Sequence, residues 1–198
     1  MISVRTPLLA AAALAAALTL SACSAAAPAT DTDTDTDSSS ASDVFNSADV
    51  MFAQMMIPHH EQAVEMSDDL LAKDDIDEDI VALATEIKAA QQPEITQLQD
   101  WLIEWDAEAQ PMSDMGDGSD GSDGMMTADD MMALQNASGA EAGELFLQQM
   151  TEHHEGAVVM AQVEVDDGAH ADARMMAANI IETQTAEIAT MAALLAAQ

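Results

Sequence analysis

The chain carries one segment twice, as MIPHHEQAVEM at residues 56–66 and as MTEHHEGAVVM at residues 150–160. Seven of the eleven positions are identical, and they include a double histidine in a chain that has five histidines in total. A second motif, Gln-x-x-Glu-Ile, follows each copy, at 91–95 and at 184–188. Two matches at nearly the same separation indicate duplication of one structural unit.

Both units show the periodicity of one-faced helices. Apolar residues and histidines recur at intervals of four and three residues, which places them on a single helical face. Segments with alternating strand-like patterning are absent from both units. The sequence therefore predicts an all-α, antiparallel four-helix bundle made of two duplicated αα-hairpins. The four predicted helices span residues 48–71, 76–106, 139–165 and 171–197.

Helix starts are marked by capping residues. A Ser, Thr or Asn followed three residues later by an acidic residue can satisfy the free N–H groups of the first helical turn. The pair at Thr127 also predicts a short helix between the two units. Three pairs have this spacing: Asn46 with Asp49, Thr127 with Asp130, and Ser138 with Glu141.

The N-terminus has the organisation of an export signal. Arg5 precedes an apolar run at 8–20, and Leu-Ser-Ala leads into Cys23. This tetrad resembles the bacterial lipobox, which predicts a lipoprotein signal peptide at 1–22 and lipidation of Cys23. A plain secretory signal that leaves Cys23 as a lone thiol is the alternative. Both predict export, with the protein lipid-anchored to the outer face of the cell membrane or periplasmic.

The remaining chain divides by composition. Alternating Asp and Thr followed by serine can bury nothing, which predicts a disordered acidic tether after the anchor. The rest, 46–198, contains both helical units. The predicted parts are a tether at 23–45, unit one at 46–106, a Met/Asp/Gly-rich crossover at 107–137 and unit two at 138–198.

Composition excludes several classes of protein. The chain of 198 residues has 37 acidic and 4 basic side chains, a formal net charge of −33, so nucleic acid and anionic membranes are not its partners. Such acidity also suits a high-salt habitat. One cysteine permits neither an internal disulfide nor a cysteine-based zinc site. Aromatic residues make up 3% of the chain, so its core must depend on aliphatic side chains and on 16 methionines.

Paired histidines on an apolar helix face need partners for their ring nitrogens. One interpretation is a buried hydrogen-bond network that fixes helix register. The other is a metal ion, with the same polar groups orienting each imidazole. The candidate partners on the neighbouring helices are Gln91, Glu94, Gln184 and Glu187.

Methionine makes copper the metal to consider. Met56 precedes His59 by three residues and Met150 precedes His153 likewise, so thioether and imidazole can meet over one turn. Thioether with imidazole and without thiolate favours copper, preferentially Cu(I), or silver, with Cu(II) possible. If the first and third long helices lie diagonally, His59 and His153 approach each other in the bundle centre.

The other methionines have two interpretations. Methionine on a helix face commonly fills core space, and this applies to Met66, Met160 and Met191. An exposed crossover has no core to fill, which favours weak accessory soft-metal ligands or sacrificial oxidation sites there. Its Asp-Gly run fits a solvated connection better than a calcium loop. The predicted accessory ligands are Met112, Met115, Met125, Met126, Met131 and Met132.

Enzymatic alternatives lack their residues. A di-iron bundle needs Glu-x-x-His on two helices, whereas Met56, Ile57, Met150 and Thr151 stand three residues before the paired histidines. A serine or cysteine nucleophile does not accompany the histidines. We therefore predict that the protein is not an enzyme.

The repeated segments and the Gln-x-x-Glu-Ile motifs resemble the family catalogued as domain of unknown function 305, over about residues 48–198. The resemblance implies an exported, ferritin-like helical bundle, and some relatives are associated with copper binding and tolerance. Pro58 stands in the first unit only, with Glu152 in its place in the second. The metal ligands that the resemblance implies are Met56, His59, His60, Met66, Met150, His153, His154 and Met160.

The sequence thus predicts an exported copper-binding lipoprotein that buffers, sequesters or transfers the ion. A copper-handling protein is a possible partner, and the membrane is contacted only through the N-terminal lipid. The alternative is a metal-independent surface interaction module in which the histidines are structural hydrogen-bonding groups.

Overall fold

The computed structural model describes residues 44–109 and 124–197, and these form helices without strands. The four long predicted helices are present, with ends within two residues of the predicted ones, and the short helix after Thr127 is present as well. The helices are α1 (Ser47–Leu71), α2 (Glu78–Glu104), α3 (Ala128–Asn136), α4 (Gly139–Asp167) and α5 (Ala171–Ala197). In this part of the chain, no helix is long and apolar enough to cross a membrane.

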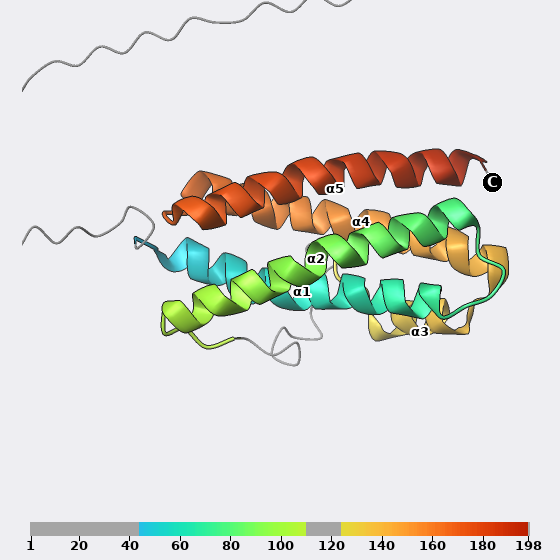
Figure 1. The fold of residues 1–198 in the computed structure, drawn as a ribbon, viewed down its shortest axis with the longest axis horizontal. Helices are drawn as coiled ribbons and strands as arrows, with labels where there is room; N and C mark the ends of the chain where they lie inside the picture. The colour runs from blue at the N-terminus through green and yellow to red at the C-terminus, as the bar shows by residue number, and fades with distance from the viewer. Residues whose placement is uncertain (1–43, 110–123, 198) are drawn as a thin grey trace, which may run out of the picture. The chain divides into compact units, whose positions relative to one another are not determined.

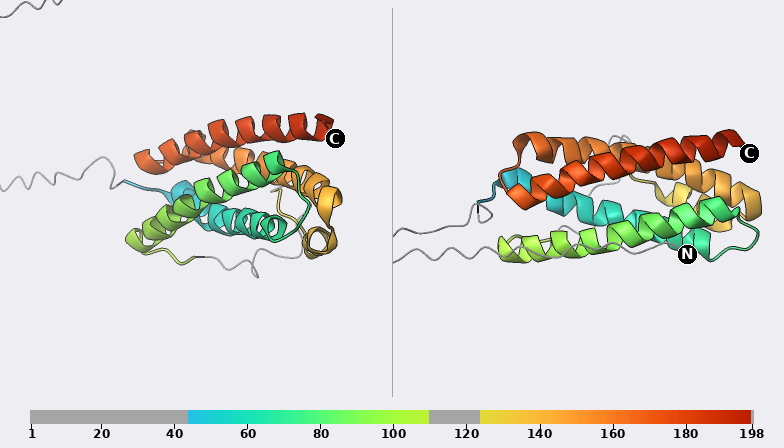
Figure 2. Two further views of the ribbon diagram at one scale, coloured as in Figure 1. Left: turned by 45° about the vertical axis from the view of Figure 1, so that its right-hand side comes forward. Right: turned by 45° about the horizontal axis from the view of Figure 1, so that its top comes forward.

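The two hairpins, α1–α2 and α4–α5, lie against each other along their length (Figure 1). α2 ends beside the start of α1, whereas α4 starts at the opposite end of the bundle (Figures 1 and 2). The end of α2 and the start of α4 therefore lie at opposite ends of the bundle, and α3 packs beside α1. As a result, α1 and α4 are antiparallel neighbours, and the diagonal placement considered from the sequence is wrong.

Two apolar clusters build the core, one toward each end of the bundle. One cluster contains side chains from the second half of α1 and from the first halves of α2 and α4, and the other contains side chains from the opposite halves of these helices. This division follows from antiparallel packing. In α1 and in α4 the paired histidines stand between the segments that enter the two clusters. The polar layer therefore divides the core near its middle. Representative members are Leu70, Ile87, Phe146 and Met191 in one cluster and Phe52, Trp101, Ala161 and Ile180 in the other.

Two of the three predicted capping boxes form. Asn46 caps α1 and Thr127 caps α3, each in reciprocal hydrogen bonds with the acidic residue three positions on. Ser138 makes no side-chain capping bond, so the prediction for α4 is wrong. The reason lies in Gly139, whose φ of +57° departs from the helical geometry that a box requires.

Asp49 also ties the start of α1 to the turn between α4 and α5. Its buried carboxylate accepts hydrogen bonds from the backbone N–H groups of Ala169 and His170, at 3.1 and 2.8 Å. Burial alone raises the pKa of Asp49, but these bonds and that from the Asn46 N–H outweigh burial and hold it below its usual value. An ionised carboxylate thus links residues about 120 positions apart.

Candidate metal centre

Four imidazoles lie in the layer between the two core clusters. The rings of His59 and His153 meet across α1 and α4 with their centroids 3.7 Å apart. Within each helix the paired rings are 6.5 Å apart in α1 and 6.3 Å in α4. The approach of His59 to His153 is as predicted, although their helices are neighbours. The exposed fractions are 1% for His59 and 0% for His60, His153 and His154.

Each outer histidine of this layer is bonded to a glutamate of the neighbouring helix. His60 Nε2 lies 2.8 Å from Glu94 Oε2, and His154 Nε2 lies 2.8 Å from Glu187 Oε2. A carboxylate only accepts hydrogen bonds, so Nε2 of each ring is the donor, and when the ring is neutral the lone pair is on Nδ1. Carboxylate–imidazole pairs of this kind orient histidine for metal binding.

Several buried nitrogen and oxygen atoms of this layer have no hydrogen-bond partner among the described residues. They include Nδ1 of His60 and Nδ1 of His154. The side-chain amide of Gln91 and the Oε1 atom of Gln184 also have no hydrogen-bond partner in this part of the chain. The glutamines therefore do not complete the buried hydrogen-bond network that the sequence analysis gave as one interpretation. A buried polar group without a partner costs roughly 1–3 kcal/mol, so this layer is destabilising unless something binds it.

Burial keeps the centre of the layer neutral. It lowers the pKa of His153 well below its ordinary value, and the neighbouring histidines His59, His154 and His60 lower it further. A neutral imidazole can donate its lone pair to a cation, whereas an imidazolium cannot. His153 is therefore in the protonation state that metal binding requires.

The predicted methionine ligands are divided between different environments. Met56 and Met150 are fully buried, and each precedes its histidine pair by one turn, on opposite sides of the layer. Met66 is fully buried in the same apolar cluster as Met150, where it fills core space. Met160 is only half-buried and lines a surface groove.

The sequence predicts that the crossover methionines are exposed, but in the structure two of them are buried. Met126 and Met131 are 9% exposed and pack into the core, because α3 and the segment before it lie against α1 and α4. Met132 is 50% exposed and Met125 is half-buried. Met112 and Met115 lie outside the described residues, as does Cys23.

The chain returning from the crossover is anchored beside the histidines. The Gln62 side chain donates to the Met126 carbonyl at 2.9 Å and accepts from its N–H at 2.7 Å. Gly124 has a φ of +74°, and a Cβ there would stand 2.6 Å from the Glu152 carbonyl oxygen and 3.0 Å from that of His153. Only glycine fits this contact, a role that sequence reasoning missed.

On the side of α2 and α5 the layer is closer to solvent. A cavity of about 370 Å³ is lined by Glu94, whose carboxylate holds His60, and by Asp172, Met175 and Met176. The Glu94 side chain is 25% exposed. This carboxylate is thus a link between the surface and the buried imidazoles.

The fifth histidine lies elsewhere. His170 is buried between the edges of Trp101 and Trp105, with ring centroids 5.3 Å from each. Its Nδ1 accepts the Ala173 N–H and caps α5. Among the described residues no group of three or more His, Cys, Asp or Glu side chains could hold a metal ion. An ion in the histidine layer therefore needs thioether or amide ligands in addition.

Fold and site together define an all-α bundle with a buried, carboxylate-supported histidine layer. The chain belongs to the family described as Domain of unknown function (DUF305), whose sequence profile matches residues 49–195. No curated protein matches it.

Solved structures of the same fold include two other DUF305 proteins. A putative secreted protein from Streptomyces coelicolor is 38% identical, with 76% of this chain and 93% of that one covered and a TM-score of 0.68. A DUF305 fragment from Deinococcus radiodurans is 27% identical, with 77% and 98% covered and a TM-score of 0.69.

CopM in its Cu(I)-bound form is also similar, at 28% identity, with 74% of this chain and 94% of that one covered and a TM-score of 0.62. CopM has been solved in Cu(II)-bound and Ag-bound forms as well.

Proposed function

We propose that this protein binds copper in its histidine layer and buffers, sequesters or transfers the ion outside the cytoplasm. The observation that carries the proposal is the set of buried imidazole nitrogens without a partner. His60 and His154 each present an unpartnered Nδ1 while a glutamate holds Nε2. A bound cation would remove the energetic cost of burying these lone pairs.

The donor set favours copper over other metals. Neutral imidazoles with the thioethers of Met56 and Met150 nearby are soft to borderline ligands, and thiolates are absent from the described residues. Full burial excludes water, which favours the less strongly hydrated Cu(I) over Cu(II). The copper- and silver-bound forms of CopM support this choice.

Each polar residue has a distinct task in this proposal. Glu94 and Glu187 fix the tautomer and orientation of His60 and His154. Glu94 also faces the cavity between α2 and α5, so that its carboxylate can attract a cation from solvent toward the layer. Copper is the cargo in this mechanism, and the proposed role is binding without catalysis.

Anchoring is the second part of the proposal. A lipid on Cys23 would hold the domain at the outer face of the cell membrane, within reach of a copper-handling partner. Met112, Met115, Met125 and Met132 would then be weak accessory ligands on the crossover. Globomycin, which blocks cleavage of lipoprotein precursors, should cause the uncleaved form to accumulate, and Cys23→Ala should release the protein from membranes.

The decisive experiment is a Cu(I) titration of the untagged protein against a competing chelator. We expect the wild type to remove copper from the chelator and the His59→Ala/His60→Ala/His153→Ala/His154→Ala variant to lose this ability. His170→Asn is the matched control, since His170 is buried but lies outside the layer and asparagine can still cap α5.

Folding is followed by circular dichroism in the same samples. If the quadruple variant unfolds, His60→Gln with His154→Gln is the substitute, because glutamine keeps a group that can donate to each glutamate. Failure of the wild type to take up copper would overturn the proposal and leave a metal-independent interaction module with structural histidines.

A further inference from the structure

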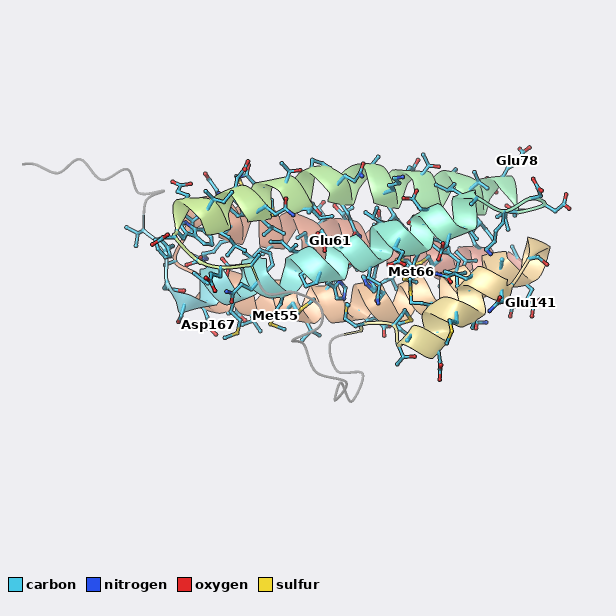
Figure 3. All side chains as sticks on the ribbon, turned by 90° about the horizontal axis from the view of Figure 1, so that it is seen from below. Met55, Glu61, Met66, Glu78, Glu141 and Asp167 are labelled. Atoms are coloured by element: carbon cyan, nitrogen blue, oxygen red, sulfur yellow. The ribbon has the colours of Figure 1, made fainter. Side chains whose placement is uncertain are left out.

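A groove lies between the start of α1 and the end of α4, on a part of the bundle that the proposed function does not use. Its volume is about 630 Å³. Figure 3 shows Met55 and Asp167 at this end of the bundle, with Glu78 and Glu141 at the other end. Met51, Met55 and Met160 supply three thioethers to its lining.

The three methionines can converge because of helix geometry. Met51 and Met55 are four residues apart on α1 and so lie one turn apart on one face. Met160 comes from α4, which runs antiparallel beside α1. It lies seven residues beyond His153, roughly 10 Å along the helix, so that this groove is separate from the histidine layer.

Core packing accounts for only one of these side chains, since Met160 packs against the apolar cluster that contains Phe52 and also lines the groove. Met51 is 56% exposed, and Met55 and Met160 are half-buried. The wall between them is apolar and includes Phe52, Val159 and Val163. Flexible thioethers gathered around an open cavity differ from the buried Met56, Met66 and Met150, which lie in the two core clusters.

One buried polar group also lines the groove. Glu164 is 1% exposed, and its carboxyl group pairs with the carboxylate of Asp49. Burial, together with the nearby Asp49, raises the pKa of Glu164 to about 8, so this acid is neutral at pH 7. Asp167, at the rim, is exposed. The groove therefore offers soft sulfur donors and an uncharged inner wall, to which hard cations are poorly suited.

We propose that Met51, Met55 and Met160 form a second metal site, which takes a soft monovalent cation, Cu(I) or Ag(I), independently of the histidine layer. Three thioethers are a suitable ligand set for such an ion, and the apolar wall holds it with little water. The formal charge of −33 concentrates cations near the surface from which this site is open. Zn²⁺ and Ca²⁺ should not bind there.

The test uses Ag(I), which is stable in air, with the untagged full chain and a Met51→Leu/Met55→Leu/Met160→Leu variant. Leucine preserves volume and apolarity, so the fold should survive. We expect the variant to bind one Ag(I) fewer than the wild type. In the wild type, the ε-methyl NMR signals of these three methionines should shift together on titration. The matched control is Met191→Leu, the same substitution at a methionine that is fully buried in the apolar core.

The outcomes separate this site from the histidine layer. Retention of one methionine-dependent Ag(I) in the quadruple histidine variant would support the groove even if the layer failed to bind copper. Equal silver binding by the wild type and the triple leucine variant would overturn the proposal. The proposal would also be overturned if the wild type and the triple leucine variant both bound an apolar fluorescent probe in the groove but neither bound silver there. That result would identify the groove as an apolar docking surface.

Discussion

His60 donates to Glu94 in the first unit and His154 donates to Glu187 in the second, with the same nitrogen–oxygen distance of 2.8 Å. Around this shared feature the two units differ. The position of Gln62, bonded to the crossover, is taken by Gly156 in the second unit, where Gly124 packs closely.

The ends of the units differ as well. Leu70 in the apolar core corresponds to Glu164, a buried acid, and Met66 in the core corresponds to Met160 at a groove. The duplicated bundle thus keeps its histidine–carboxylate geometry and varies the packing on either side. Geometric requirements are therefore strictest in the polar layer, and four predictions test this difference between the units.

The largest effect is expected at the glycine that packs on the second unit. Gly124→Ala should destabilise the fold by about 3 kcal/mol, because the added Cβ meets backbone and the residue has positive φ. Gly139→Ala is the control, since its positive φ remains but the added Cβ would make only an ordinary contact, 3.8 Å from the Asp75 carbonyl oxygen, and about 1 kcal/mol is expected. Urea denaturation measures both. Similar losses in the two variants would show that the crossover does not pack as described.

Glu164 occupies the position in the second unit that Leu70 occupies in the first, and this difference predicts a pH dependence of stability that is specific to the second unit. Glu164 has a folded-state pKa of about 8 against an ordinary 4.5, so its contribution to stability is present below pH 4.5 and is lost as pH rises toward 8. Glu164→Gln should remove this loss. Relative to the variant, the wild type should lose on the order of 2–3 kcal/mol between pH 5 and pH 8.

Chemical denaturation at several pH values measures this difference. The lowered pKa of His153 also makes the fold less stable as the pH falls below the ordinary pKa of histidine, 6.5. This effect is the same in the wild type and in Glu164→Gln, so it cancels in the comparison. A constant difference between wild type and variant across this range would show that Glu164 is already ionised in the folded protein.

The shared feature itself predicts similar losses in both units. Glu94→Gln and Glu187→Gln should each weaken Cu(I) binding roughly 10- to 100-fold, because the amide holds the imidazole less strongly than the carboxylate does. Glu187→Gln should have the larger effect, since the Glu187 side chain is 15% exposed and that of Glu94 is 25% exposed. Chelator competition measures both affinities, and wild-type affinity in either variant would argue against its glutamate as an orienting group.

The smallest effects concern the helix starts. Asn46→Ala removes a complete capping box and should cost about 1 kcal/mol, whereas Ser138→Ala removes no capping bond and should cost less than about 0.5 kcal/mol. Thermal unfolding at one pH distinguishes them. Equal costs would indicate that Ser138 caps α4 in solution.

Much of the fold is determined by local sequence. Periodicity places apolar residues and histidines on one face of each helix, and the repeat identifies two hairpins, since both patterns depend only on the residues within a few turns. The register of Gln91 and Glu94 on the second helix of a hairpin is local for the same reason. It predicted which glutamates could reach His60 and His154, because neighbouring antiparallel helices fix the facing positions.

Tertiary structure decided everything that depends on distant segments meeting. The packing of the hairpins makes α1 and α4 antiparallel neighbours, brings His59 to His153 and buries Met126 and Met131. Asp49 meets a turn about 120 residues away, and Met160 reaches a groove beside Met51. Helical periodicity specifies which face of a helix is buried, but the free energy of packing whole helices selects which helix covers it.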